Sequence, residues 1–180
     1  IPLLIKEGHS LTVISRQSKE KFKSLDTNQS INAIQMDPAE SASWKQEDIQ
    51  NSLKNCEGII NLAGEPIAEK RWTEDHCKEI TNSRLETTKN LIENLRNLKK
   101  PPKVLINASA IGFYGSHPQT EFTEESLPGD DFLANLCKRW ETIASNKPRA
   151  TRLVIIRIGI VLAKDGGALG KMLPIFRAGL

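Results

Sequence analysis

Residues 103–109, KVLINAS, form an apolar run that is rich in β-branched residues and ends in small ones. A run that is apolar on both faces is typical of a strand buried inside a parallel sheet. Similar runs recur at residues 10–15, 32–36, 58–63 and 152–162, and polar segments with helical spacing separate them. Strands that alternate with helices in this way predict an α/β fold with a doubly wound parallel sheet.

The segment before residues 103–109 gives the clearest helical pattern. Ser83 and Glu86 have the spacing of a capping box, which predicts that the helix begins at Ser83. Two prolines at 101–102 end the helical pattern. The apolar residues between these limits fall on one side of the predicted helix: Leu85, Leu91, Ile92, Leu95 and Leu98.

The chain opens with IPLLIKEGHS, which reads as a short helix and a stop at Gly8. A doubly wound, Rossmann-like sheet places its first strand centrally and follows it with a glycine-rich phosphate turn, and this sequence contains no such turn. We therefore expect residues 10–15 to be the second strand. Residues 1–180 would then be one Rossmann-like domain that lacks its first strand and phosphate turn at the N-terminus. We expect it to be truncated at the C-terminus as well, after Leu180. A sheet that begins natively at this point is the alternative.

The charges argue against a nucleic-acid partner. The formal net charge of the 180 residues is +3, and the basic residues are spread along the chain in pairs such as Lys99–Lys100 and Lys138–Arg139. Pairs of this kind are typical of a solvated surface rather than of a nucleic-acid footprint. We expect a small-molecule substrate as the partner.

The cysteines and the apolar runs bear on localisation. Cys56, Cys77 and Cys137 are odd in number and show no C-x-x-C spacing, which predicts reduced thiols and neither a disulfide framework nor a metal site. The most apolar stretch, residues 153–163, is too short to span a membrane and contains Arg157. No signal peptide is visible. We expect a cytoplasmic protein without membrane contact, or a plastid protein if the source is eukaryotic.

The ends of the first strands carry candidate cofactor residues. Ser15 and Arg16 follow the run at 10–15, where such folds meet the adenosine ribose. An acidic residue at this place binds ribose hydroxyls, whereas an arginine pairs with a 2′-phosphate, so Arg16 favours NADP over NAD. A surface arginine in a turn is the alternative.

Two more strand ends are candidates for the same site. Asp37 can bond the adenine amino group, although a turn-forming aspartate before Pro38 explains it equally well. The small residues of Leu62-Ala63-Gly64 would let a ligand approach the backbone, or would form a tight turn.

Several blocks occur together in an order and spacing that resemble a known family: NLAGEPI (61–67), RWTEDHCKEITNSRLETTKNLIENL (71–95), NASAIGFYG (107–115), FLANLCKRWE (132–141) and RIGIVLAKDGGALGKMLPIFRAGL (157–180). They are similar to the extended short-chain dehydrogenase/reductase superfamily. More narrowly, they resemble NAD(P)-dependent epimerase/dehydratase-like proteins of the short-chain dehydrogenase 39U type, often described as nucleoside-diphosphate-sugar epimerases.

The resemblance implies a catalytic Ser, Tyr and Lys, with the last two spaced Y-x-x-x-K on one helix. Ser109 lies where the serine is expected, and Lys138 is the candidate lysine, which would also bind the nicotinamide ribose. Four residues before Lys138 stands Ala134 instead of tyrosine. Tyr114, the single tyrosine of the chain, either has a structural or substrate-lining role or takes part directly in the chemistry.

The resemblance also implies roles near the last strand. Backbone groups of Ile158 and Gly159 would bind the nicotinamide carboxamide, and residues 166–169 (GGAL) would either hold an anionic substrate group or form a flexible turn.

The acidic cluster of Glu124, Glu125, Asp130 and Asp131 would cap the helix that begins near Asp131, or would share an acid/base role.

Together these residues predict an NADP(H)-dependent oxidoreductase or epimerase-like protein. Its substrate would be a small polar carbinol, such as a nucleotide sugar, with Ser109 polarising the substrate oxygen. The alternative is a dinucleotide-binding protein whose catalytic residues have decayed and which regulates other proteins. Some relatives implied by the resemblance are linked to cell or plastid division. Ala134 favours this alternative, and Ser109 favours the enzyme.

Overall fold

A computed structural model describes residues 1–23, 25, 30–163 and 167–179 of the chain. The N-terminal part holds helix α1 (Pro2–Lys6), strand β1 (Leu11–Ser15), the short helix α2 (Glu20–Lys23) and strand β2 (Ile31–Gln35). Gly8 follows α1 with a φ of +85°, so the predicted stop at this glycine is confirmed. The 3₁₀ turn η1 (Ser41–Lys45) and helix α3 (Glu47–Asn55) connect β2 to the rest of the molecule.

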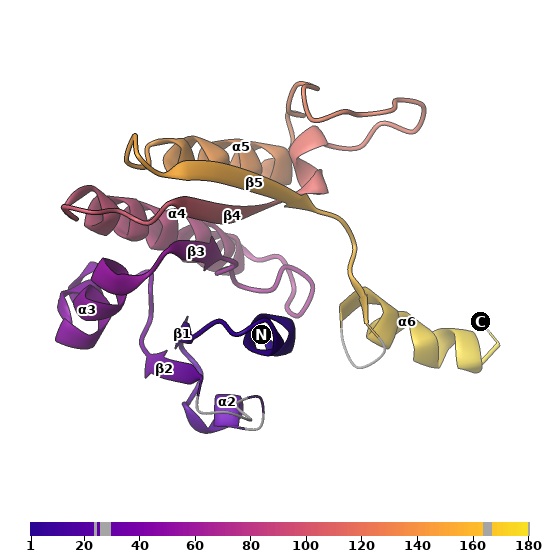
Figure 1. Cartoon of the computed structure of the whole chain (residues 1–180). Helices are drawn as coiled ribbons and strands as arrows, with labels where there is room; N and C mark the ends of the chain where they lie inside the picture. Colours follow the sequence, from indigo (N-terminus) through magenta and orange to yellow (C-terminus); the bar gives the residue numbers. More distant parts are fainter. Residues whose placement is uncertain (24, 26–29, 164–166, 180) are drawn as a thin grey trace.

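The strands form two parallel sheets (Figure 1). Strand β1 pairs with β2, with Val13 opposite Ala33. Strands β3 (Gly58–Asn61), β4 (Val104–Ala110) and β5 (Arg152–Ile158) follow one another in the order β3-β4-β5. The predicted parallel strands and Rossmann-like fold class are therefore confirmed. Among the described residues β1 is not hydrogen-bonded to β3, so the strands do not form one continuous sheet.

Two hydrophobic clusters hold the helices against the strands. The larger one joins β2, η1, α3, helix α4 (Glu74–Arg96) and β4, and the smaller one joins α4, helix α5 (Phe132–Ser145) and β4. The fully buried members include Ile49, Ile80, Leu95 and Leu105. The opposite face of the β3-β4-β5 sheet carries the exposed side chains Ile60 and Ile156.

Helix α4 has its N-cap at Thr73, ten residues before the predicted N-cap Ser83. The Oγ1 of Thr73 accepts a hydrogen bond from the backbone N–H of His76 at 3.2 Å. The capping box predicted at Ser83 is therefore wrong. Ser83 lies inside the helix, where its hydroxyl donates to the carbonyl of Ile80 at 3.0 Å. A serine can satisfy its hydroxyl inside a helix through this local bond, so S-x-x-E does not by itself mark a helix start.

A buried polar network links β3, β4, α4 and α5. The side-chain amide of Asn61 donates to Thr88 Oγ1 at 2.9 Å and to Asn107 Oδ1 at 2.7 Å. The indole of Trp140 donates to the same threonine oxygen at 2.7 Å. Buried polar groups are costly without partners, so these bonds fix the register of both helices on the sheet.

The last predicted strand, residues 152–162, is shorter in the structure. Strand β5 ends at Ile158, and the two-residue strand β6 (Leu162–Ala163) and helix α6 (Gly167–Arg177) follow. Ile160, Val161 and Leu162 are exposed, because this segment leaves the sheet after Gly159. No helix within the described ranges is both long and apolar enough to cross a membrane.

Candidate functional site

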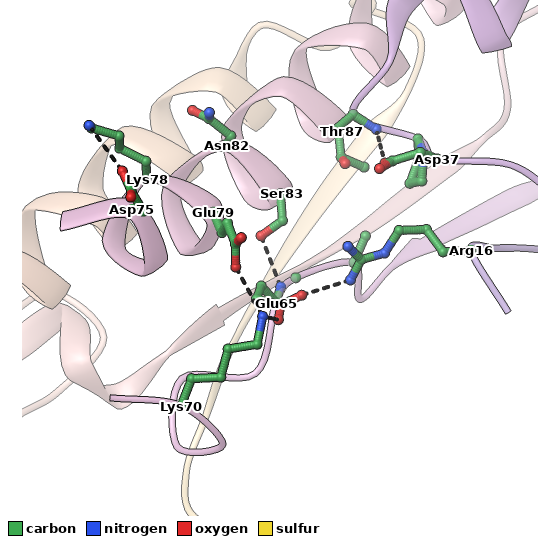
Figure 2. Close-up of a pocket in the computed structure, with 14 residues that line it drawn as sticks. Arg16, Asp37, Glu65, Lys70, Asp75, Lys78, Glu79, Asn82, Ser83 and Thr87 are labelled. Carbon is green, nitrogen blue, oxygen red and sulfur yellow. Dashed lines mark hydrogen bonds and ion pairs between the residues drawn. The ribbon is translucent and has the colours of Figure 1, made fainter. Parts of the chain in front are cut away.

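A cavity of about 500 Å³ lies where the ends of β1, β2 and β3 approach α4 (Figure 2). Arg16, Asp37, Ala63 and Gly64 line it from the strand ends, and Ser83 and Thr87 line it from the helix. In parallel α/β sheets, ligands bind outside the carboxyl ends of the strands. Four of the residues predicted to bind the cofactor therefore lie together at the place that suits a ligand.

Ser15 and Leu62, which were predicted for the same site, do not line this cavity. The hydroxyl of Ser15 accepts a hydrogen bond from the backbone N–H of Gln17 at 3.1 Å, which shapes the turn that carries Arg16. The Leu62 side chain is exposed. Direct contact of these two residues with a cofactor stays a prediction.

A chain of alternating charges crosses the mouth of the cavity. Arg16 Nη2 donates to Glu65 Oε2 at 2.8 Å. Lys70 Nζ lies 3.3 Å from Glu65 Oε1 and 3.1 Å from Glu79 Oε2. Glu65 is thus the anion that Arg16 and Lys70 share.

These contacts shift the pKa values of the charged groups. The hydrogen bond from Arg16 is the main reason that the pKa of Glu65 lies below its ordinary value, and the same bond raises the pKa of Arg16. Glu79 raises the pKa of Lys70, which in turn lowers the pKa of Glu79. All four groups are therefore charged at neutral pH.

The backbone of Glu65 is held on both sides by α4. Its N–H donates to Ser83 Oγ at 2.9 Å, and its carbonyl accepts a bond from Arg84 Nη1 at 3.0 Å. The Arg84 guanidinium lies directly against Gly64, where a Cβ atom would meet Arg84 Cζ at 2.8 Å. Burial lowers the pKa of Arg84. Glycine at 64 thus allows the chain to approach α4 closely enough for both bonds.

Asp37 and Thr87, which also line the cavity, differ in their hydrogen bonding. Asp37 Oδ1 accepts a bond from the backbone N–H of Ala39 at 2.9 Å, so this side chain does form the predicted turn around Pro38. The buried Thr87 Oγ1 has no hydrogen-bond partner among the described residues. A buried hydroxyl without a partner in the wall of a cavity suits a polar ligand.

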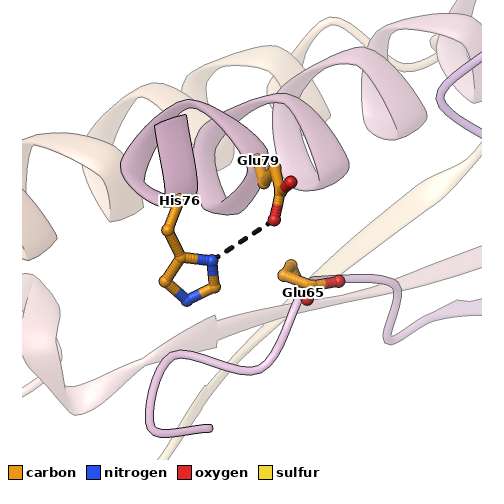
Figure 3. A group of neighbouring side chains, drawn as sticks. All are labelled: Glu65, His76 and Glu79. Atoms are coloured by element: carbon orange, nitrogen blue, oxygen red, sulfur yellow. Dashed lines mark hydrogen bonds and ion pairs between the residues drawn. The ribbon is translucent and has the colours of Figure 1, made fainter. Parts of the chain in front are cut away.

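Glu65, His76 and Glu79 bring three potential metal ligands within 4.8 Å of one another (Figure 3). His76 Nδ1 lies 3.4 Å from Glu79 Oε2. The ammonium of Lys70 contacts both carboxylates, so a lysine provides the positive charge at this place. A metal ion would have to displace Lys70 before it bound here.

A second polar cluster lies at the ends of β4 and β5. Ser109 Oγ donates to Glu141 Oε1 at 2.6 Å, and Glu141 receives two further bonds of 2.9 Å from Nε and Nη2 of Arg157. Ser109 therefore binds a carboxylate of α5 in this structure. The hydroxyl has to leave Glu141 before it can donate to a substrate oxygen.

Tyr114 belongs to the same cluster. It ends the 3₁₀ turn η2 (Ile111–Tyr114), and its Oη accepts a bond from Arg157 Nη1 at 2.9 Å. The Arg157 guanidinium also lies 3.6 Å from the centre of the Phe113 ring. Because Tyr114 accepts from Arg157, its own O–H remains available as a donor.

Ala134 and Lys138 are four positions apart on α5 and lie on neighbouring positions of the helix surface, but they differ in burial. Ala134 is fully buried, whereas Lys138 is exposed beside Arg139 and Thr142 of the same helix. The α5 side chains that contact Ser109 are Glu141 and Cys137, and burial is the main reason that the pKa of Cys137 is raised. Among the described residues Ser109 donates its hydroxyl to Glu141 and not to Lys138, and a ribose-binding role for Lys138 stays a prediction.

The remaining predicted residues have simpler surroundings. A Cβ atom at Gly159 would meet no atom within 4 Å, and Ile158 packs beside the smaller hydrophobic cluster. Their contact with a nicotinamide stays a prediction. Asp131 is the N-cap of α5 and accepts from the N–H of Ala134 at 2.8 Å, so the predicted capping is confirmed. Of residues 166–169, Gly166 lies outside the described residues, and the other three are the first residues of α6.

Sequence reasoning missed the anions that hold the candidate residues. Glu65 contacts Arg16, and Glu141 contacts Ser109, yet neither pair is close in the sequence. The only signals were the position of Glu65 just after a strand end and the W-E that closes the block at 132–141. Neither signal specifies a partner.

Comparison with known proteins identifies the family of this chain. Residues 1–160 match the NAD dependent epimerase/dehydratase family. A chloroplastic homolog of epimerase family protein SDR39U1 from Arabidopsis thaliana is 36% identical over 173 residues, which are 95% of this chain and 47% of that protein. The human SDR39U1 protein is 34% identical over 181 residues, 99% of this chain and 55% of that protein. The chain spans about half the length of these relatives.

Solved structures agree with this placement. The crystal structure of human SDR39U1 (isoform 2) with NADPH superimposes with a TM-score of 0.78 at 34% identity, covering 99% of this chain and 55% of that one. WbmG of Bordetella bronchiseptica, solved with NAD and UDP, has a TM-score of 0.75 at 14% identity over 98% of this chain and 54% of that one, which shows likeness of fold alone. With its parallel strands and a cavity at their carboxyl ends, this chain belongs to the NAD dependent epimerase/dehydratase family.

Proposed function

We propose that this chain forms the adenosine-binding part of an NADP(H)-dependent oxidoreductase or epimerase-like protein. The observation that carries the proposal is the cavity at the ends of β1, β2 and β3, with Arg16 at its edge. A guanidinium at the end of this strand matches a 2′-phosphate in charge and geometry. The NADPH in the crystal structure of the human relative supports the same cofactor.

The residues of the cavity fit the adenosine end of such a cofactor. Ala63 and Gly64 leave the backbone accessible, and the unpartnered Thr87 hydroxyl offers a polar contact in the wall. Asp37 stands where it can accept from an adenine amino group with the oxygen that Ala39 does not use. When bound, NADP(H) supplies a hydride donor or acceptor.

On the reaction side, the geometry favours Tyr114 over Ser109 as the group that meets the substrate. Tyr114 is partly exposed and keeps its O–H free to donate, while Ser109 is buried and already donates to Glu141. Tyr114 would hold the carbinol or carbonyl oxygen of a small polar substrate, such as a nucleotide sugar. Arg157, bonded to Tyr114 Oη, keeps the ring in place.

A regulatory dinucleotide-binding protein is the second candidate. It is favoured by Ala134, which is fully buried at the position where the family pattern has tyrosine, and by the exposure of Lys138. A protein of this kind binds NADP(H) and exchanges no hydride. The cavity of Figure 2 serves either candidate.

The cofactor proposal is tested by binding of NADPH and NADH to the protein at its full length, followed by cofactor fluorescence. Arg16→Ala should weaken NADPH binding by about tenfold or more and NADH binding by less than about twofold, because one charge-assisted bond to the phosphate is lost. Arg152→Ala is the matched control, since Arg152 is exposed at the opposite, amino-terminal end of β5. Equal losses for both cofactors in Arg16→Ala would refute the phosphate role.

The two candidate functions are separated by turnover. NADPH oxidation and NADP reduction are measured against a panel of sugar nucleotides and simple carbonyl compounds. The enzyme proposal expects turnover that falls about a hundredfold in Tyr114→Phe, since general acid–base catalysis contributes a factor of this order. Tight NADPH binding with no hydride exchange across the panel supports the regulatory candidate instead.

A further inference from the structure

In the proposed function Arg16 binds the 2′-phosphate of the cofactor. In the structure Glu65 is bonded to this arginine. The carboxylate of Glu65 bonds Arg16 at 2.8 Å at the edge of the cavity. We infer that Glu65 is a specificity-determining residue, which competes with the 2′-phosphate for Arg16 and so reduces the preference for NADP over NAD. This inference rests on the proposed function, and it concerns a residue that faces the cofactor rather than one that binds it.

The two partners differ in their freedom to move. The Glu65 side chain is 13% exposed, and its backbone is held by Ser83 and Arg84. The Arg16 side chain is 55% exposed, and the carboxylate of Glu65 is the partner of its guanidinium in the described structure. A phosphate that binds Arg16 therefore either draws the arginine away from Glu65 or settles beside a carboxylate that stays in place.

The charges around the cavity make a contact between the phosphate and the Glu65 carboxylate unfavourable. Three cations and four anions line it, which is a net of one negative charge: Arg16, Lys70 and Lys78, and Asp37, Glu65, Asp75 and Glu79. Lys70 lies 3.1 Å from Glu79 and 3.3 Å from Glu65, and Lys78 lies 3.5 Å from Asp75. A phosphate monoester brings between one and two further negative charges and is repelled by Glu65.

The same carboxylate treats NAD differently. NAD has a 2′-hydroxyl in place of the phosphate, and a carboxylate near the ribose accepts hydrogen bonds from such hydroxyls. Glu65 thus weakens binding of the 2′-phosphate, but its effect on binding of the 2′-hydroxyl is neutral or favourable. Glu65 therefore lowers the ratio of the two affinities, and Arg16 raises it.

The inference is tested in the full-length protein by the dissociation constants of NADPH and NADH, read from cofactor fluorescence, for wild type and Glu65→Gln. Removal of the charge should tighten NADPH binding by about tenfold and change NADH binding by less than about twofold. Glu65→Ala, which leaves no amide to bond Arg16, should shift NADPH in the same direction. Circular dichroism confirms that each variant is folded.

Two glutamates serve as matched controls. Glu57→Gln breaks an exposed ion pair with Lys103 outside the cavity and should change neither constant. Glu79→Gln removes a charge that contacts Lys70 but not Arg16, and should tighten NADPH by less than about threefold.

The outcomes are decisive in both directions. Weaker NADPH binding in Glu65→Gln would mean that the carboxylate positions Arg16 for the phosphate, and an unchanged ratio would mean that it does not compete; either result overturns the inference. An equal gain in Glu79→Gln overturns it too, because the effect would then be a general field. Failure of the proposed function has a different signature, namely an unchanged ratio in Arg16→Ala.

Discussion

Two arginine–glutamate pairs stand at the ends of the strands, and they are built differently. Arg157 binds Glu141 through two hydrogen bonds of 2.9 Å, and the Arg157 and Glu141 side chains are 18% and 14% exposed. The Arg157 guanidinium also lies 3.6 Å from the centre of the Phe113 ring. Arg16 binds Glu65 through one bond of 2.8 Å, and its own side chain is 55% exposed. The same two residue types therefore make a closed contact in one place and an open one in the other.

The difference indicates what each pair does. A bidentate pair that is nearly removed from water keeps its geometry, because neither partner has another place to put its charge. An exposed single bond is screened and exchanges readily with solvent or ligand. Arg157 thus joins β5 to α5 and η2, whereas Arg16 remains available to an anion.

The largest expected effect comes from breaking the closed pair. Arg157→Leu leaves the Glu141 carboxylate with Ser109 as its remaining partner in the cluster, and it removes the bonds to Tyr114 and to the carbonyl of Glu124. We expect a loss of about 3 kcal/mol in the free energy of unfolding, measured by urea titration with circular dichroism.

Arg16→Leu is the comparison variant for this experiment. Because its pair is exposed, the same measurement should give a change below about 0.5 kcal/mol. If the two variants lost similar amounts of stability, the distinction between a closed and an open pair would be wrong.

A smaller effect is expected from the glycine that sets the position of Glu65. Gly64→Ala places a Cβ atom 2.8 Å from Arg84 Cζ, and Arg84 cannot retreat easily because it bonds the carbonyls of Ile80 and Glu65. We expect a loss of about 2 kcal/mol in thermal or urea unfolding.

Gly159 offers a matched glycine for this prediction. It follows β5, and an added Cβ atom there meets nothing within 4 Å. Gly159→Ala should therefore change stability by less than about 0.5 kcal/mol. Equal effects at the two glycines would show that the contact with Arg84 does not matter.

The smallest expected effect is the pH dependence of the open pair. The bond from Arg16 lowers the pKa of Glu65 in the folded protein, whereas an unfolded glutamate has a pKa of about 4.3. A lowered folded pKa means that the pair stabilises the fold above about pH 4.3 and that this contribution is lost as the pH falls through the folded pKa. Because Arg16 is exposed, the contribution should stay below about 1 kcal/mol.

Glu65→Gln isolates this contribution. Its stability, measured by urea unfolding at successive pH values, should decline less steeply below pH 4.3 than that of the wild type. Identical slopes for the two proteins would show that Glu65 has no lowered pKa in the folded state.

The sequence predicted the fold well where the pattern is local. Runs such as residues 103–109 are apolar on both faces, and the structure confirms them as parallel strands because buried strands need apolar side chains on both sides. The start of α4 was predicted wrongly, since Ser83 and Glu86 repeat a capping pattern inside a helix that Thr73 begins. Local patterns give the kind of element more reliably than its ends.

The candidate site was predicted only in part. Arg16, Asp37, Ala63 and Gly64 all follow strands, and the topology of a parallel sheet brings strand ends together, so their common cavity follows from the fold class. Lys138 was chosen as the lysine of the family pattern on the predicted helix, with Ala134 at the tyrosine position, yet the face of α5 that meets Ser109 carries Cys137 and Glu141. The orientation of a helix on its sheet decides such contacts, and a spacing rule borrowed from relatives does not contain it.

What the sequence determined by itself was the alternation of strands and helices, the family and the identity of the cation after the first strand, because each depends on residues that are neighbours along the chain. The tertiary structure decided which anion each cation meets. Arg16 and Glu65 are separated by 49 positions, and Arg157 and Glu141 lie on different elements. Charges act through space, so only the packed arrangement shows that one arginine is enclosed by its partners and the other is open to a ligand.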